Sequence, residues 1–119
     1  MNKKILIVDD QFGIRALLSE VFQDEGFETF EASNGNDAFK LLGTEEPDMI
    51  LLDMKIPGMD GLEILRKIRA DQNDVNVIIM TAYGEVARMN EAKSLGVLAY
   101  IAKPFDIDIV REKVIQLLA

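Results

Sequence analysis

Met49–Gly61 reads MILLDMKIPGMDG, and this stretch decides the fold. Four consecutive apolar residues lead directly into Asp53, and Pro57 and Gly58 mark a loop after it. An apolar run this short, bounded by turn residues, predicts a strand buried on both faces, as in the middle of a parallel sheet. Asp53 would then stand at the carboxyl end of that strand, the edge where open α/β sheets bind ligands. On this stretch alone, Asp53 could equally start a turn or cap the next helix.

Further apolar runs at residues 4–8, 28–32, 77–80 and 99–102 predict the other strands, and the run at 28–32 suits a sheet edge because polar residues interrupt it. Apolar residues at helical spacing predict helices at about residues 11–25, 34–42, 62–69, 85–95 and 107–117, and Asn34 and Asp106 are suited to cap two of them. Alternating strands and helices indicate a parallel sheet covered on both faces. We therefore expect an α/β fold with a doubly wound, five-stranded parallel sheet in the order 2-1-3-4-5, flavodoxin-like in topology, as one domain over residues 1–119.

Composition excludes several classes of protein. The 119 residues are 49% apolar, which is enough for one domain with a real core, and no apolar run approaches the roughly 20 residues of a membrane helix. The absence of Cys and His removes disulfides, thiolate metal sites and the commonest general base. A net charge of −8 argues against binding nucleic acid or an anionic membrane. We expect a cytoplasmic protein whose metal ion, if it has one, is a hard cation bound by oxygen, such as Mg²⁺ or Mn²⁺.

The carboxyl ends of the predicted strands supply polar side chains that can share one site: Asp9, Asp10, Asp53, Thr81 and Lys103. In the order 2-1-3-4-5 the first and third strands are neighbours, which would place the two N-terminal acids beside Asp53. Three close carboxylates repel one another and favour a bound cation, and Mg²⁺ readily binds substrate phosphate as well. The pattern indicates phosphoryl transfer, with Asp53 as nucleophile and with Lys103 and Thr81 contacting phosphoryl oxygens. Taken singly, the N-terminal acids could instead cap the first helix, and Lys103 could be a surface cation.

Four segments also match a known pattern: IVDD at residues 7–10, LLDMKIPGMDG at 51–61, MTAYG at 80–84 and AKPF at 102–105. In this order and at this spacing they resemble the receiver domain of response regulators in two-component signalling. The resemblance spans nearly the whole chain. The wording MKIPGMDG, IIMTAYGE and KPFDID looks closest to the single-domain regulators of the sporulation phosphorelay.

The resemblance implies a role for each acid. Asp53 matches the phosphoacceptor. Asp10 matches the residue that binds Mg²⁺ directly, and Asp9 matches the acid that usually reaches the metal through water. Lys55 would contribute its backbone carbonyl to the same ion.

The resemblance also implies roles for residues on the last two strands. Thr81 and Lys103 would hold the phosphoryl oxygens, and the Lys103–Pro104 peptide bond would be cis. Tyr100 stands where the family has its switch aromatic, a position where the sporulation regulators often carry His. Tyr100 could instead be an aromatic that fills space beside the last helix.

A chain without His cannot offer a phosphohistidine, so a phosphoryl group must come from a partner or a small acyl phosphate. We expect a monomer that accepts it from a sensor histidine kinase and passes it to a histidine phosphotransferase, in a phosphorelay that controls sporulation. The alternative is a stand-alone receiver that binds other proteins when phosphorylated.

Two further classes are less consistent with the residues. A turnover hydrolase of the haloacid dehalogenase type would need an acid two residues after Asp53, where Lys55 stands, so we expect no turnover enzyme. In a flavodoxin-like flavin carrier, Asp9 and Asp10 would repel the flavin phosphate.

A patch beside the expected site predicts where a partner docks. The first helix carries an apolar stripe wider than packing on one sheet face requires. We expect a four-helix phosphotransfer bundle to contact a patch formed by Gln11, Ile14, Leu17, Tyr83, Pro104 and Phe105. Plain core packing is the alternative for Ile14 and Leu17.

Overall fold

The computed structural model describes residues 2–82 and 86–118. Within them, five strands alternate with five helices. The strands are β1 (Lys4–Val8), β2 (Glu28–Ala32), β3 (Met49–Asp53), β4 (Asn76–Ala82) and β5 (Ala99–Lys103). The helices are α1 (Phe12–Asp24), α2 (Gly35–Glu45), α3 (Gly61–Ala70), α4 (Val86–Ser94) and α5 (Ile107–Leu118). All strand pairs are parallel, in the order β2-β1-β3-β4-β5, which confirms the predicted doubly wound sheet with β2 at an edge.

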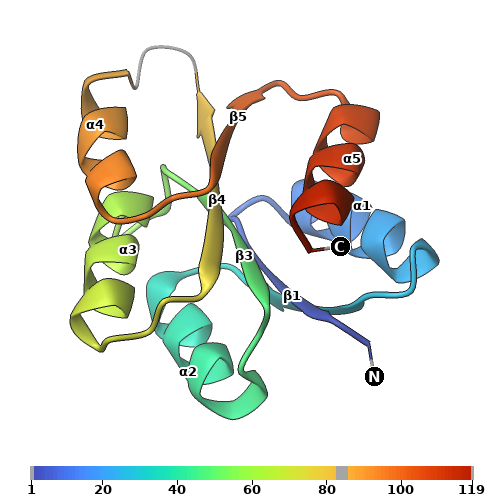
Figure 1. Ribbon diagram of the computed structural model, residues 1–119, viewed down its shortest axis with the longest axis horizontal. Coiled ribbons are helices and arrows are strands. Elements are labelled where there is room, and N and C mark those ends of the chain that lie inside the picture. The colour runs from blue at the N-terminus through green and yellow to red at the C-terminus, as the bar shows by residue number, and fades with distance from the viewer. Residues whose placement is uncertain (1, 83–85, 119) are drawn as a thin grey trace.

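Helices cover both faces of the sheet, with α1 and α5 on one side and α2, α3 and α4 on the other (Figure 1). Successive residues of a strand point to opposite faces. In β3, Ile50 and Leu52 therefore join the apolar cluster under α2, α3 and α4, whereas Met49 and Leu51 join the cluster under α1 and α5. This is why all of β3 is buried. No described helix is both long enough and apolar enough to cross a bilayer.

Side-chain caps fix the beginning of three helices. The Asn34 Oδ1 accepts a hydrogen bond from the Asp37 amide at 2.9 Å, and Asp60 does the same for the Glu63 amide at 3.0 Å. Asp106 Oδ1 accepts from the Asp108 amide at 2.8 Å. The predicted caps at Asn34 and Asp106 are thereby confirmed, and each satisfies an amide that would lack a partner in the first turn.

Two elements, α2 and β4, run two or more residues further at their carboxyl ends than predicted. Helix α2 continues through Gly43 to Glu45 and ends where Glu46 adopts a left-handed conformation, with φ of 47°, immediately before Pro47. The helix was predicted to end at about residue 42, but it continues until Pro47, which cannot continue the hydrogen-bond ladder. Strand β4 runs on to Ala82, so Thr81 lies within it. The predicted start of the fourth helix at residue 85 falls outside the described residues.

The beginning of α3 packs directly against the end of β3. The Gly61 amide donates to the Met54 carbonyl at 2.9 Å. A Cβ on Gly61 would overlap the Asp53 carbonyl oxygen and lie 2.8 Å from the Cα of Met54. Both obstacles are backbone atoms, so no side-chain rotation can relieve them, and this close approach requires glycine. The contact fixes the loop that follows Asp53.

Adding one methyl group at this contact should cost stability. We expect Gly61→Ala to lower the free energy of unfolding by about 1–3 kcal/mol, as overpacking of a rigid site does. Urea denaturation measures it. Gly43→Ala is the matched control, because a Cβ there meets no atom within 4 Å and the residue is helical. The control should gain up to about 1 kcal/mol. A Gly61→Ala protein as stable as the wild type would contradict the packing argument.

Candidate functional site

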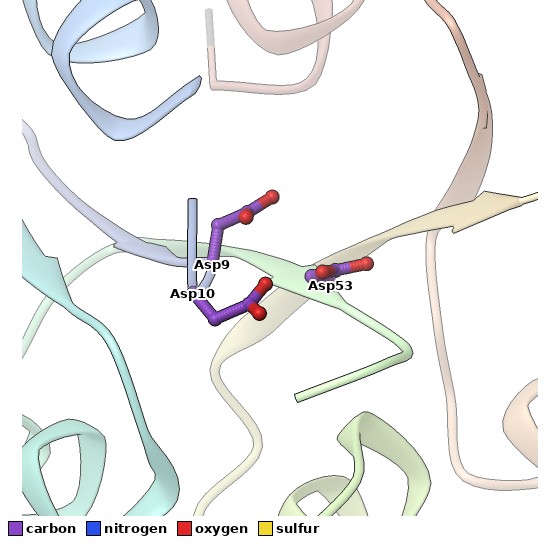
Figure 2. Close-up of side chains that lie close together, drawn as sticks. All are labelled: Asp9, Asp10 and Asp53. Atoms are coloured by element: carbon purple, nitrogen blue, oxygen red, sulfur yellow. The ribbon is translucent and has the colours of Figure 1, made fainter. Parts of the chain in front are cut away.

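The ends of β1 and β3 bring three carboxylates together (Figure 2). The two strands are neighbours, with Val8 opposite Leu52, so the residues that follow β1 lie beside Asp53. One carboxylate oxygen from each of Asp9, Asp10 and Asp53 lies within 4.8 Å of the other two. Asp9 and Asp53 are buried, whereas Asp10 is exposed. The structure therefore assembles the three predicted acids in one place.

Lys103, at the end of β5, links two of these acids. Its Nζ lies 2.7 Å from Asp9 Oδ2 and 3.3 Å from Asp53 Oδ2. No side chain in the described part of the chain pairs with the Asp10 carboxylate. One ammonium cannot balance three carboxylates, so the site retains an excess of negative charge.

This charge distribution suits a divalent cation. Burial, and then the negative charge of Asp9, raise the pKa of Asp53 above its ordinary value, while Lys103 and the Lys55 amide oppose that shift. A bound cation would favour the charged carboxylate instead. The donors are all oxygen, and exposed Asp10 leaves room for water, which matches the preferences of Mg²⁺. The residues present therefore fit a magnesium ion.

Two other predicted site residues lie at the same edge of the sheet. Thr81 follows Met80, which is the register partner of Asp53 across β3 and β4, and Thr81 is half-buried. The Lys55 amide points to Asp53 Oδ1 at 3.4 Å. The Lys103–Pro104 peptide bond is cis, as predicted.

Tyr100, in β5, contacts helix α4 and not the carboxylates. It pairs with Ile79 in the β4–β5 register, and its hydroxyl donates to the Met89 carbonyl of α4 at 3.2 Å. Its ring packs against the apolar cluster under α2, α3 and α4. Tyr100 thus connects β5 to α4 in the structure described here.

A groove adjoins the carboxylates. It has a volume of about 410 Å³ and is lined by Gln11, Ile14, Leu17, Lys103, Pro104 and Phe105. Five of the six residues predicted for a docking patch therefore share one concave surface, and the sixth, Tyr83, lies outside the described residues. Leu17 is 45% exposed, which excludes core packing for it, whereas Ile14 also packs against the cluster under α1 and α5.

The contacts that hold Asp9 were not predicted. The Gln11 amide donates to Asp9 Oδ1 at 2.8 Å, and Arg15 Nη1 donates to the Asp9 backbone carbonyl, also at 2.8 Å. Arg15 occupies an ordinary polar position on α1, and nothing in its spacing signals a contact with backbone six residues earlier. The N-cap residue of α1 is Gln11, and it makes no side-chain cap hydrogen bond, so the alternative that the two acids cap the helix is not what the structure shows.

Comparison with known proteins relates this geometry to a family. The family described as response regulator receiver domain matches residues 5–115. Sporulation initiation phosphotransferase F of Bacillus subtilis is 58% identical over 114 residues, which cover 96% of this chain and 92% of that protein. Regulatory protein AtoC of Escherichia coli is 44% identical over 88% of this chain but only 23% of its own length. A solved receiver domain protein from Methanospirillum hungatei has a TM-score of 0.93 at 29% identity, covering 99% of this chain and 94% of that one.

The raised pKa of Asp53 predicts that the metal-free protein loses stability as the pH rises. A carboxyl group with a raised pKa in the folded state destabilises folding at pH values above that pKa, and the penalty disappears below its unfolded value near 3.8. We expect Asp53→Asn in EDTA to raise the free energy of unfolding at neutral pH. The gain should shrink as the pH falls through the folded-state pKa. Urea denaturation across this pH range measures it.

Asp71→Asn provides the control, because exposed Asp71 stands at the other end of α3. It should change stability by no more than about 0.5 kcal/mol. If Asp53→Asn raises the free energy of unfolding at neutral pH no more than Asp71→Asn does, the carboxylate cluster does not destabilise the fold.

Proposed function

The chain belongs to the response regulator receiver domain family, and from this premise we propose that it accepts a phosphoryl group on Asp53 and passes it on in a phosphorelay. The observation that carries the proposal is the cluster of three carboxylates with Lys103 within ion-pair distance of Asp53. The 58% identity to a sporulation initiation phosphotransferase supports sporulation as the process controlled. We propose that residues 1–119 act as one receiver domain, monomeric and cytoplasmic.

The proposed transfer is a displacement at phosphorus. An Asp53 carboxylate oxygen attacks the phosphorus of a partner's phosphohistidine, a P–O bond forms, and the P–N bond breaks with its electron pair remaining on the imidazole nitrogen. Asp9, Asp10 and Asp53, with the backbone carbonyl of Lys55, would hold Mg²⁺ or Mn²⁺, which when bound neutralises charge on the phosphoryl oxygens. Asp53 is only 5% exposed, so its carboxylate is largely shielded from bulk solvent.

Two residues of the outer strands would receive the phosphoryl group. Lys103 Nζ already lies 3.3 Å from Asp53 Oδ2, so a group bound there would be within its reach. The Thr81 hydroxyl would donate to a second oxygen. The acyl phosphate adds a charge of about −1.5 to −2, enough to redirect these donors. We propose that the same change breaks the Tyr100–Met89 hydrogen bond and so reports phosphorylation to α4.

The groove is the proposed docking surface for a sensor histidine kinase and a histidine phosphotransferase. Lys103 lines it and also contacts Asp53, so a partner helix in the groove would bring its histidine next to the acceptor. The exposed apolar side chain of Leu17 offers contact area that a partner can bury. Such a chain is a phosphoryl carrier rather than a turnover enzyme, because Lys55 stands where a hydrolase would need its acid.

Incubation with acetyl phosphate tests the phosphoacceptor. We expect a mass gain of one phosphoryl group in the presence of Mg²⁺, no gain in EDTA, and no gain for Asp53→Asn. Intact mass spectrometry measures the gain, and peptide mapping locates it. Labelling of the wild type at any other residue, or none with Mg²⁺ present, would overturn the proposed function.

The docking surface has a separate test. Leu17→Ala should slow phosphoryl transfer from a phosphorylated histidine phosphotransferase by about tenfold, because burial of an exposed leucine at an interface is worth over 1 kcal/mol. Labelling by acetyl phosphate should stay unchanged. Leu98→Ala is the matched control, since Leu98 is 46% exposed and lies outside the groove. Equal loss for both variants, or loss in both assays, would remove the groove as the docking site.

A further inference from the structure

We propose that Arg15 is a positioning residue that holds the Asp9–Asp10 peptide unit and so keeps the Asp10 carboxylate directed toward Asp53. The inference rests on the proposed function, because it concerns the affinity of the same site for its metal. Arg15 touches neither a carboxylate of the cluster nor the phosphoryl group in this arrangement. Its effect would pass through the backbone.

The segment that carries Asp10 has little regular structure to hold it. Strand β1 ends at Val8 and α1 begins at Phe12, so Asp9 and Asp10 lie between elements. The Asp9 amide still donates to the Ala32 carbonyl at 3.1 Å, but the Asp9 carbonyl has left the strand ladder. Arg15 Nη1 donates to that carbonyl at 2.8 Å. The bond therefore fixes the plane of the peptide from which Asp10 extends.

No side chain in the described chain pairs with the Asp10 carboxylate. Asp9 is held at both carboxylate oxygens, by Lys103 at 2.7 Å and by the Gln11 amide at 2.8 Å. The Asp10 carboxylate has no comparable partner among those residues, although Figure 2 shows it turned toward Asp53. Its direction is therefore set by its backbone, which Arg15 holds at the Asp9–Asp10 peptide and the Asp9 carboxylate holds at the Gln11 amide.

Arg15 is itself fixed in place. Its side chain is only 16% exposed, and its Nε lies 3.4 Å from Glu31 Oε1 on the edge strand β2. Its guanidinium carbon lies 5.8 Å from the centre of the Phe12 ring, which is otherwise 73% exposed. The planar fork of a guanidinium can hydrogen-bond to the Asp9 carbonyl and pair with the Glu31 carboxylate at the same time. A lysine ammonium cannot match that geometry. The exposed Phe12 ring at the start of α1 thus lies within cation–π distance of this guanidinium.

The affinity for Mg²⁺, measured by isothermal titration calorimetry without any phosphodonor, tests the inference. Removing an outer-shell partner of a metal site typically costs 10- to 100-fold in affinity. We expect Arg15→Met to raise the Kd for Mg²⁺ about tenfold, and Arg15→Lys, which keeps the charge but not the fork, to fall between Arg15→Met and the wild type. Glu31→Gln should have a smaller effect, because Glu31 is 38% exposed and its ion pair is screened.

Arg111→Met is the matched control, because it removes the same charge from the protein. Arg111 pairs with Glu25, just past the opposite end of α1 and so roughly 20 Å along the helix from Asp10. The Kd of the Arg111→Met protein for Mg²⁺ should equal that of the wild type. A Kd that rises equally in Arg111→Met would show that net charge, not position, is responsible, and would overturn the inference.

The outcomes separate this inference from the proposed function. An unchanged Kd in Arg15→Met overturns the positioning role and leaves phosphorylation of Asp53 intact. A wild type that binds Mg²⁺ but never accepts phosphate overturns the proposed function alone. Thermal unfolding in EDTA shows whether Arg15→Met folds; if it does not, Arg15→Lys decides, and a Kd equal to that of the wild type contradicts the proposal.

Discussion

Mutual repulsion among three carboxylates is the constraint on which the rest of the structure depends. Asp9 and Asp53 are buried, and a buried charge is costly unless it is paired and hydrogen-bonded. The fold meets this requirement by bringing three strand ends together. Asp9 follows β1, Asp53 ends β3, and Lys103 at the end of β5 pairs with both carboxylates. With three carboxylates and one lysine, two negative charges remain for a ligand to neutralise. The negative charge that makes the cluster costly to bury is therefore the same charge that would attract a cation.

Much of this arrangement was predictable because it depends on local patterns. Short apolar runs that end in polar residues identify the strands, and a parallel sheet places all their carboxyl ends on one edge, so Asp9, Asp10, Asp53, Thr81 and Lys103 could be grouped before any coordinates. Caps at Asn34 and Asp106 were predictable for the same reason, since each involves residues only two or three apart.

Other features depend on where side chains meet between elements, and these were not predictable. The hydrogen bond from Arg15 to the Asp9 carbonyl joins a helical side chain to backbone outside any element, and periodicity contains no information about it. The same holds for the Tyr100–Met89 bond across β5 and α4. The exposure of Leu17 was left open, because a stripe at helical spacing does not show how far the neighbouring helix covers it. The end of α2 was predicted three residues too early, because the apolar spacing ends at Leu42 while the helix continues to Glu45, just before Pro47.

The sheet separates two apolar clusters, and the groove and the Tyr100 contact lie on different sides of it. The groove lies on α1 and the segment after β5, on the side packed by α1 and α5, whereas the Tyr100 contact with α4 belongs to the opposite side. On the proposed function, recognition of a phosphoryl donor and the response at α4 would therefore lie on opposite sides of the sheet. Substitutions on one side of the sheet could then change the upstream partner while leaving the contact between Tyr100 and α4 in place.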